Sequence, residues 1–198
     1  MAIQDASFVE LDNLVRSLQT CINTSLMRAI GPDVKDVALL DFPHHANVGD
    51  SAIWLGEVAF LRSNGLRSVY GCDHIKYDSK KLAEAIGEGP ILLHGGGNFG
   101  DVWPIYQTFR HAVIERFPDN PIVQLPQTLH FSDLSSINTT RRLIERHRNF
   151  KLFVRDANSL AFAQEHFPSS CPEPCPDAAF MLGRLVSPVP ATDRKSVV

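Results

Sequence analysis

The sequence predicts an α/β domain in which a parallel β-sheet is covered by helices on both faces. Two observations carry this prediction. Short apolar segments of strand type alternate with amphipathic segments of helical period between residues 36 and 167, and such alternation is typical of parallel sheets. Polar residues and glycines follow the apolar segments directly. Because ligands bind at the carboxyl ends of parallel strands, this second pattern also indicates where a site would lie.

A long helix is predicted before the alternation begins, over residues 5–30. Apolar residues recur there at three- and four-residue steps, and Gly31-Pro32 ends the pattern. The polar face mixes acidic and basic residues, whereas a helix that lies on a membrane surface is rich in Lys and Arg. We therefore expect this helix to pack on its own domain or on a second copy of the chain. The apolar stripe consists of Phe8, Leu11, Val15, Leu18, Ile22, Leu26 and Ile30.

Five predicted strands and five predicted helices follow in alternation. Glycines suit the ends of two helices, and Pro104 suits the first turn of a third. The order predicts a Rossmann-like sheet, with residues 1–35 as an N-terminal helix, 36–185 as the α/β domain and 186–198 as an exit segment. The predicted strands cover residues 36–42, 67–72, 90–94, 121–125 and 151–155, and the helices cover 50–65, 78–87, 104–117, 135–149 and 157–167.

Composition narrows the possible functions. The chain has 198 residues, of which 44% are hydrophobic and 21% charged, as in a globular domain. A net charge of −3 argues against nonspecific binding to nucleic acid, which needs a basic surface. The sequence has no membrane-length apolar run and its start lacks the pattern of a signal peptide, so we expect a cytoplasmic protein. The pair Cys171 and Cys175 lacks the other ligands of a zinc site, and no metal is predicted.

Two loops after predicted strands carry glycines. In the first, Gly49 permits a tight turn, and Asp50 or Ser51 is expected to cap the next helix, whose free N–H groups would attract an anion. An ordinary capped helix explains this loop equally well. The second, residues 95–100, is expected to be a loop whose backbone N–H groups approach a ligand. It also fits G-x-G-x-x-G, but no acidic residue follows at a second strand end, so a dinucleotide is not favoured.

Charged and titratable side chains also follow the strands. Arg155 ends the fifth predicted strand, and its guanidinium could bind a carboxylate or phosphate through two parallel hydrogen bonds. An ion pair with Asp156 is the alternative. Candidates for a general acid or base are the histidines that follow strands, namely His44, His45, His94 and His130.

Taken in order, these loops resemble the polysaccharide pyruvyl transferases. Members of that family show an N-x-G-D segment, a Gly-Gly-Gly segment with a following Asp, a Pro-Gln-[Ser/Thr] segment, an Arg-[Asp/Glu]-x-x-Ser segment and an Asp-x-Ala-Phe segment. The corresponding segments here are ANVGDSA, HGGGNFGD, LPQTLHF, VRDANSLAF and PDAAF, within residues 37–182. Each motif alone is common, but five in this order are fairly specific. Two positions depart from the pattern, because Ala178 replaces the usual proline and Leu129-His130 stands where many members have Ile-Gly.

The resemblance implies transfer of a pyruvyl group from phosphoenolpyruvate to a sugar diol, which forms a cyclic ketal on an exopolysaccharide or its lipid-linked precursor. It also implies a GT-B-type fold of two Rossmann-like domains, of which this chain would be the N-terminal half. The second domain would supply a histidine and basic residues. No cofactor is implied beyond phosphoenolpyruvate as donor substrate. The implied partners are a sugar or lipid-linked oligosaccharide acceptor and either a missing C-terminal domain or a second copy of the chain, with the inner membrane as an alternative location.

The site residues expected from the loops and from the resemblance fall into two groups. Asp50, Asp101 and His94 are the candidate acid and base groups. The candidate substrate-binding residues are Asn47, Gly49, Ser51, Gly95, Gly96, Gly97, Asn98, Gln127, Thr128, Arg155, Asp156 and Asp177.

Two other functions stay open at this point. One is a glycosyltransferase of the same two-domain architecture, and the other is a non-catalytic sugar-binding module.

Overall fold

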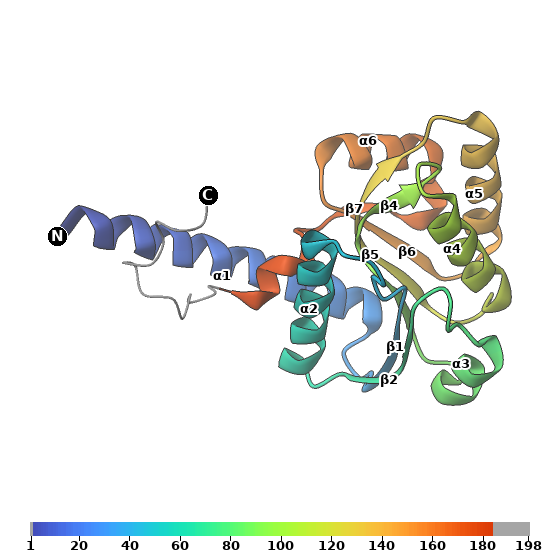
Figure 1. Cartoon of the computed structure of the whole chain (residues 1–198), viewed down its shortest axis with the longest axis horizontal. Helices are drawn as coiled ribbons and strands as arrows, with labels where there is room; N and C mark the ends of the chain where they lie inside the picture. The colour runs from blue at the N-terminus through green and yellow to red at the C-terminus, as the bar shows by residue number, and fades with distance from the viewer. Residues whose placement is uncertain (1, 184–198) are drawn as a thin grey trace.

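The computed structural model describes residues 2–183, with side chains from residue 9 onward. It contains a seven-stranded parallel sheet in the order β2-β1-β3-β5-β6-β7, with β4 paired to β5. The strands are β1 Asp36–Leu40, β2 Arg67–Cys72, β3 Ile91–Leu93, β4 Gly96–Gly100, β5 Ile122–His130, β6 Phe150–Val154 and β7 Glu173–Pro174. The helices are α1 Ala2–Ile30, α2 Val48–Ser63, α3 Ser79–Ile86, α4 Pro104–Arg116, α5 Leu134–Arg146 and α6 Ala157–His166, with short 3₁₀ helices η1 Pro168–Ser170 and η2 Ala178–Leu182 (Figure 1).

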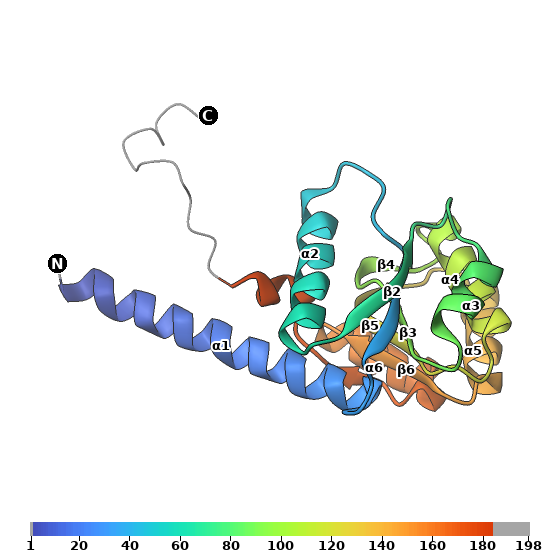
Figure 2. The same cartoon turned by 90° about the horizontal axis from the view of Figure 1, so that it is seen from below.

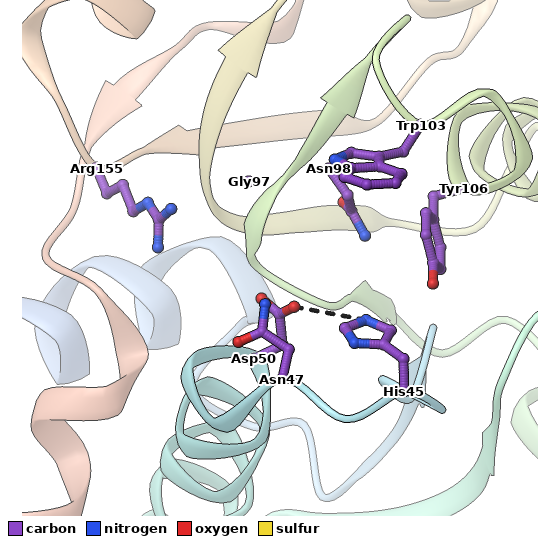
Figure 3. A pocket seen from close by; sticks show the side chains of 8 residues that line it. All are labelled: His45, Asn47, Asp50, Gly97, Asn98, Trp103, Tyr106 and Arg155. Carbon is purple, nitrogen blue, oxygen red and sulfur yellow. Dashed lines mark ion pairs between the residues drawn. The ribbon is translucent and has the colours of Figure 1, made fainter.

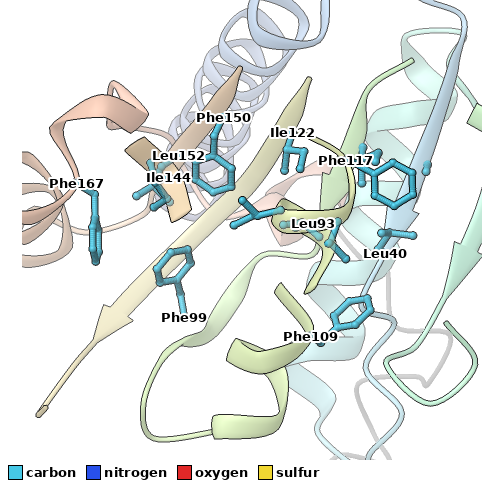
Figure 4. Close-up of a cluster of buried hydrophobic side chains, with 14 of the residues drawn as sticks. Leu40, Leu93, Phe99, Phe109, Phe117, Ile122, Ile144, Phe150, Leu152 and Phe167 are labelled. Atoms are coloured by element: carbon cyan, nitrogen blue, oxygen red, sulfur yellow. The ribbon is translucent and has the colours of Figure 1, made fainter. Parts of the chain in front are cut away.

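Helices cover both faces of the sheet, as the sequence predicts (Figure 2). Alternate residues of a strand point to opposite faces. Val37 and Leu39 therefore pack with α1 and α2, whereas Ala38 and Leu40 belong to the cluster that α3, α4, α5 and α6 complete (Figure 4). Because the central strands are buried on both sides, their sequences are continuous apolar runs rather than alternating ones.

The strand order places a crevice at the carboxyl ends of the strands. When β4 is left out and the other six strands are renumbered, their order is 2-1-3-4-5-6, which is the doubly wound order 2-1-3-4-5 with one further edge strand. The connection that leaves β1 and the one that leaves β3 then run to opposite sides of the sheet. Ligands of such sheets bind between these diverging loops, so the fold itself indicates the position of a site.

Where its side chains are described, helix α1 is buried mainly toward its carboxyl end. Ile22, Leu26 and Ile30 are buried against the sheet, as the predicted stripe requires. The stripe is not buried toward the amino end, where Leu11 is 56% exposed and the nearby Val9 is 59% exposed. Both views show this end of the helix projecting away from the sheet (Figures 1 and 2).

Within residues 2–183, no helix combines the length and the apolar character that crossing a membrane requires.

The glycine-rich segment forms a strand, so the prediction of a loop over residues 95–100 was wrong. β4 continues the sheet past the short β3 and pairs with the carboxyl-terminal part of β5. Glycines are needed at Gly95, directly before β4, and at Gly100, its last residue, because two backbones approach closely there. A Cβ on Gly95 would lie 2.7 Å from the carbonyl oxygen of Pro126, and one on Gly100 would lie 1.7 Å from that of His130.

β5 is also longer than predicted, because it continues beyond Pro126 instead of ending at Leu125. Proline cannot donate to a sheet ladder, and this one lies at the register shift between Gln124 and Gln127, where β5 is irregular against β6. β7 adds a two-residue edge strand that the sequence did not predict. The predicted exit segment 186–198 lies outside the described residues.

Candidate active site at the carboxyl edge of the sheet

A cavity of ≈ 510 Å³ opens at the carboxyl edge of the sheet, where the strand order places the crevice. Its walls come from the start of α2, from β4 and the start of α4, and from the residue that follows β6. The residues that line it are His45, Asn47, Asp50, Gly97, Asn98, Trp103, Tyr106 and Arg155 (Figure 3).

Asn47 caps α2, so the prediction that Asp50 or Ser51 would do so was wrong. The Asn47 side chain accepts a hydrogen bond from Gly49 N at 2.9 Å, because the backbone of the cap is extended. The earlier start places Asp50 in the first helical turn, where its carboxylate lies 3.5 Å from His45 Nε2. This carboxylate already occupies the position at which a helix start favours negative charge. Gly49 and Ser51 shape the turn but do not line the cavity.

His94 lies in a buried ion pair with Glu57. Both side chains are at most 2% exposed, and His94 Nδ1 lies 2.8 Å from Glu57 Oε2. The other carboxylate oxygen accepts a hydrogen bond from Gly95 N at 2.8 Å. Burial lowers the pKa of His94, but the charge and hydrogen bond of Glu57, with support from Asp41 and Asp50, outweigh burial and leave this pKa above its ordinary value. His94 Nε2 is buried without a hydrogen-bond partner among the described residues.

Of the three consecutive glycines, Gly97 is the one that lines the cavity. The N–H of Gly95 is bound to Glu57, and Gly96 is buried with a φ of 113°. A Cβ on Gly97 would lie 3.4 Å from Arg155 Nη2, so glycine leaves room for this guanidinium at the cavity wall.

Arg155 is held by side chains from two other segments of the chain. Its Nη1 lies 2.5 Å from Asp177 Oδ2, and its Nε donates to Thr128 Oγ1 at 2.9 Å. The Thr128 hydroxyl donates to Asp156, which caps α6. The ion pair of Arg155 is therefore formed with Asp177 and not with its sequence neighbour Asp156. These contacts fix the guanidinium at the cavity while its second terminal nitrogen stays beside Gly97.

Asp101 is separated from the other candidate residues. Its carboxylate accepts hydrogen bonds from the backbone N–H groups of Ser132 and Asp133, both at 2.8 Å, and from the Ser132 hydroxyl at 3.1 Å. Burial raises the pKa of Asp101, but these hydrogen bonds outweigh burial and leave the pKa below its ordinary value. Asp101 lines a different cavity between α4 and α5.

Buried polar side chains fix the orientation of Asn98. Arg110 Nη2 and Gln127 Nε2 donate to Asn98 Oδ1, at 2.8 and 2.9 Å. The amide nitrogen of Asn98 donates to Asp41 Oδ2 at 3.3 Å. Burial lowers the pKa of Arg110 to about 10, so this side chain stays charged at neutral pH. Arg110 also binds Gln124 at 2.6 Å, which ties the network to the middle of β5.

Sequence reasoning missed three buried charged residues near the cavity, Asp41, Glu57 and Arg110, and also the buried amide of Gln124. A signal existed for two of them. Glu57 and Arg110 each stand three and four residues before buried apolar residues of the same helix, so each places a charge on an apolar helix face. Such a charge must be paired inside the protein. Asp41 directly follows β1, but no pattern in the sequence indicated its burial.

Among the residues that the structure describes, no group of three or more His, Cys, Asp or Glu side chains could hold a metal ion.

Comparison with known proteins decides the family. The sequence model of a family described as polysaccharide pyruvyl transferase matches residues 47–196. The chain belongs to the polysaccharide pyruvyl transferase family. Pyruvyl transferase 1 of Schizosaccharomyces pombe is 33% identical over 140 residues, which cover 68% of this chain and 35% of that protein. EpsO of Bacillus subtilis is 32% identical over 153 residues, which cover 76% of this chain and 46% of that protein.

The chain thus spans about half or less of the length of these family members. A crystal structure of a functionally uncharacterised protein from Klebsiella pneumoniae subsp. pneumoniae NTUH-K2044 has the same fold, with a TM-score of 0.58 and 14% sequence identity. The match covers 84% of this chain and 57% of that chain. The Rossmann-like fold of this family member is therefore confirmed.

Proposed function

We propose that this chain takes part in the transfer of a pyruvyl group from phosphoenolpyruvate to a sugar diol, which forms a cyclic ketal during polysaccharide biosynthesis. The match to the pyruvyl transferase family over residues 47–196 carries the proposal. The cavity supports it, because one opening combines a fixed guanidinium with a carboxylate–histidine pair. Since the chain spans about half of its relatives or less, their remaining part is proposed to supply further contacts to the donor.

Arg155 is the proposed anchor for the carboxylate or phosphate of the donor. A planar guanidinium offers several N–H groups in a fixed plane, and the contacts with Asp177 and Thr128 use only two of its nitrogens. The remaining nitrogen lies beside Gly97, where no side chain blocks the approach of an anion. Thr128, Asp156 and Asp177 then act by holding Arg155.

The reaction needs a proton source and a base. A proton is added to the methylene carbon of phosphoenolpyruvate, and one sugar hydroxyl adds to the neighbouring carbon while its proton passes to a base. The C–O bond to phosphate breaks with its electron pair on phosphate, and the second hydroxyl adds to the same carbon and loses its proton. The products are the ketal and inorganic phosphate.

Asp50 is the proposed base, because its carboxylate lines the cavity and lies beside His45. His45, which lines the cavity and lies 3.5 Å from Asp50, is the proposed proton source. No step is assigned to His94, because its ring is buried in the pair with Glu57 and does not line the cavity. Asn47 and Asn98 are proposed to orient hydroxyl groups from the cavity wall. No step is assigned to Asp101, which lies in another cavity with both oxygens bound.

Two variants test the donor anchor. Arg155→Ala is expected to abolish binding of phosphoenolpyruvate in titration calorimetry, whereas Arg142→Ala, which removes an exposed arginine of α5, should leave it unchanged. Asp177→Asn separates a binding role from a structural one, because it breaks the ion pair but keeps the guanidinium. Weakened but measurable binding in Asp177→Asn supports the anchor, because the guanidinium is still present but no longer held by its ion pair. Unchanged donor affinity in a folded Arg155→Ala protein would show that the anion binds elsewhere.

The activity itself is tested by phosphate release together with the mass of the acceptor, with phosphoenolpyruvate and a mixture of lipid-linked and free oligosaccharides. EpsO of Bacillus subtilis, assayed in parallel, is a relative of greater length. A pyruvyl mass gain supports the proposal. Transfer of a hexose would instead indicate a glycosyltransferase, which the family match does not favour. Sugar binding without turnover would indicate a binding module.

A further inference from the structure

The two sides of the cavity differ in chemistry. Arg155 supplies positive charge on one side, and Trp103 and Tyr106 present aromatic rings on the other, with Gly97 between them (Figure 3). Cavities of this size accept ligands much larger than a three-carbon compound such as phosphoenolpyruvate. A phosphoenolpyruvate bound at Arg155 therefore leaves the aromatic side available for a second ligand.

Trp103 is unusually exposed for a tryptophan. Trp103 is the N-cap residue of α4, but its side chain makes no capping hydrogen bond. The residue is 56% exposed to solvent. Tyr106, one turn later, is half-buried and packs edge-on against His74 at 5.2 Å and His45 at 6.2 Å between ring centroids. The two histidines restrain the Tyr106 ring, and His45 lines the cavity together with Trp103 and Tyr106. One side of the cavity is therefore aromatic.

The polar groups next to this aromatic side have a fixed donor and acceptor pattern. Arg110 and Gln127 occupy the oxygen of Asn98, and its amide nitrogen donates one hydrogen to Asp41. The second hydrogen of this nitrogen is the one that can donate to a ligand. The carboxylate of Asp50 is an acceptor at the same cavity. A neighbouring donor and acceptor are suited to a pair of hydroxyl groups, each of which can both donate and accept.

Resting on the function proposed above, we propose that Trp103 and Tyr106 form the seat of the acceptor, a pyranoside that stacks its C–H face on these rings and directs a free diol toward Asn98 and Asp50. Pyranose rings are apolar on the faces where their C–H bonds gather, and aromatic rings bury such faces without needing charge. This placement orders the groups as sugar ring, diol, donor carbon and Arg155 across the cavity. The hydroxyls then meet the donor at the base, Asp50.

The assignment is tested by sugar binding without turnover. Saturation-transfer NMR is recorded on the full chain with methyl galactoside, methyl glucoside and methyl mannoside, and tryptophan emission is followed in parallel. The chain has two tryptophans, Trp54 and Trp103. At least one pyranoside should show transfer to its C–H protons and change the emission. Trp103→Ala should weaken this binding about tenfold or more, whereas Trp103→Phe should keep the transfer but lose the emission change.

Leu134→Ala is the matched control, because Leu134 is also highly exposed, at 72%, but does not line the cavity. If Trp103→Ala leaves saturation transfer unchanged, or if all three pyranosides fail to bind while phosphoenolpyruvate binds, the seat is overturned. The seat would also be overturned if none of the sugars bound and a uridine nucleotide instead changed the emission of Trp103.

Turnover gives a second readout that separates this inference from the proposed function. If pyruvyl transfer occurs, Trp103→Ala should raise the KM for the acceptor about tenfold while the KM for phosphoenolpyruvate stays the same. Equal changes in both values would contradict an acceptor seat. Sugar binding that depends on Trp103 in a protein that never transfers pyruvate would support the seat and refute the transferase function.

Discussion

The central strands of this sheet differ sharply between their middles and their carboxyl ends. Their middles are apolar and buried on both faces, from Val37 to Leu40 in β1 and from Ile91 to Leu93 in β3. At their carboxyl ends, equally buried positions carry Asp41 and His94, at 3% and 2% exposure. The middles are held by apolar packing, whereas the ends are held by charges and amides that bind one another. One atom each of Asp41, His94 and Gln127 is nevertheless buried without a hydrogen-bond partner among the described residues. The difference indicates that burial at the carboxyl edge is maintained for a site, because apolar residues would stabilise it with fewer requirements.

The largest effect that would test this contrast is expected from Arg110→Met. The substitution leaves Gln107, Gln124 and Asn98 without their charged donor in a buried place, and it should lower the free energy of unfolding by about 3–5 kcal/mol. Leu92→Ala in the apolar middle should cost a similar amount, about 2–5 kcal/mol, through a cavity. Urea denaturation measures both. A loss below about 1 kcal/mol for Arg110→Met would show that the polar ends do not depend on their network.

A somewhat smaller effect, on the order of 3 kcal/mol, is expected from Glu57→Gln, and it should depend on pH. The folded-state pKa of His94 is raised, so the ion pair contributes fully below the ordinary pKa of about 6.5 and its contribution is lost as pH rises through the raised value. The stability difference between wild type and variant should therefore shrink as pH increases above that range. Unfolding curves across pH, with an NMR titration of His94, measure this dependence. A difference that grows with pH would contradict the pairing.

The smallest effect is expected at the rim of the site. Asn47→Ala removes the cap of α2 and should destabilise the protein by about 1 kcal/mol. At the opposite edge, Arg67→Ala breaks an exposed pair with Asp36 and should not shift the melting temperature measurably. Differential scanning calorimetry of the two variants compares the edges. If Asn47→Ala and Arg67→Ala shift the melting temperature equally, the rim of the site is no more ordered than the exposed surface at the opposite edge.

Much of this fold follows from the sequence because local patterns determine it. Buried strands were recognisable as apolar runs, and helices such as α3 carried a cap residue and a final glycine. The strand β4 was not recognisable, since its glycines serve a close approach to β5 that only the assembled sheet reveals. The cap of α2 was misplaced by a few residues because several residues that can cap a helix follow one another there.

The site was predictable where residues follow strands and unpredictable where they come from helix interiors. Asn47, Asp50, Asn98 and Arg155 were expected from loop positions, and the structure brings them to one cavity. Glu57 and Arg110 reach the same region from the middle of helices, and no short spacing links them to their partners. Asp101 follows its motif in sequence, yet the chain turns after β4 and directs its carboxylate toward the start of α5.

The uneven packing of α1 gives one continuous helix two different stabilities. At ~1.5 Å per residue its 29 residues extend roughly 43 Å, more than the width of a small domain. Helical turns with few tertiary contacts are marginal in water. Amide hydrogens around Val9, Leu11 and Leu14, which are more than half exposed, are therefore expected to exchange with solvent through local opening of low free energy. Amide hydrogens around Ile22, Leu26 and Ile30 exchange only when the sheet beneath them also opens. The boundary between the two exchange regimes marks how far the domain's own core reaches along this helix.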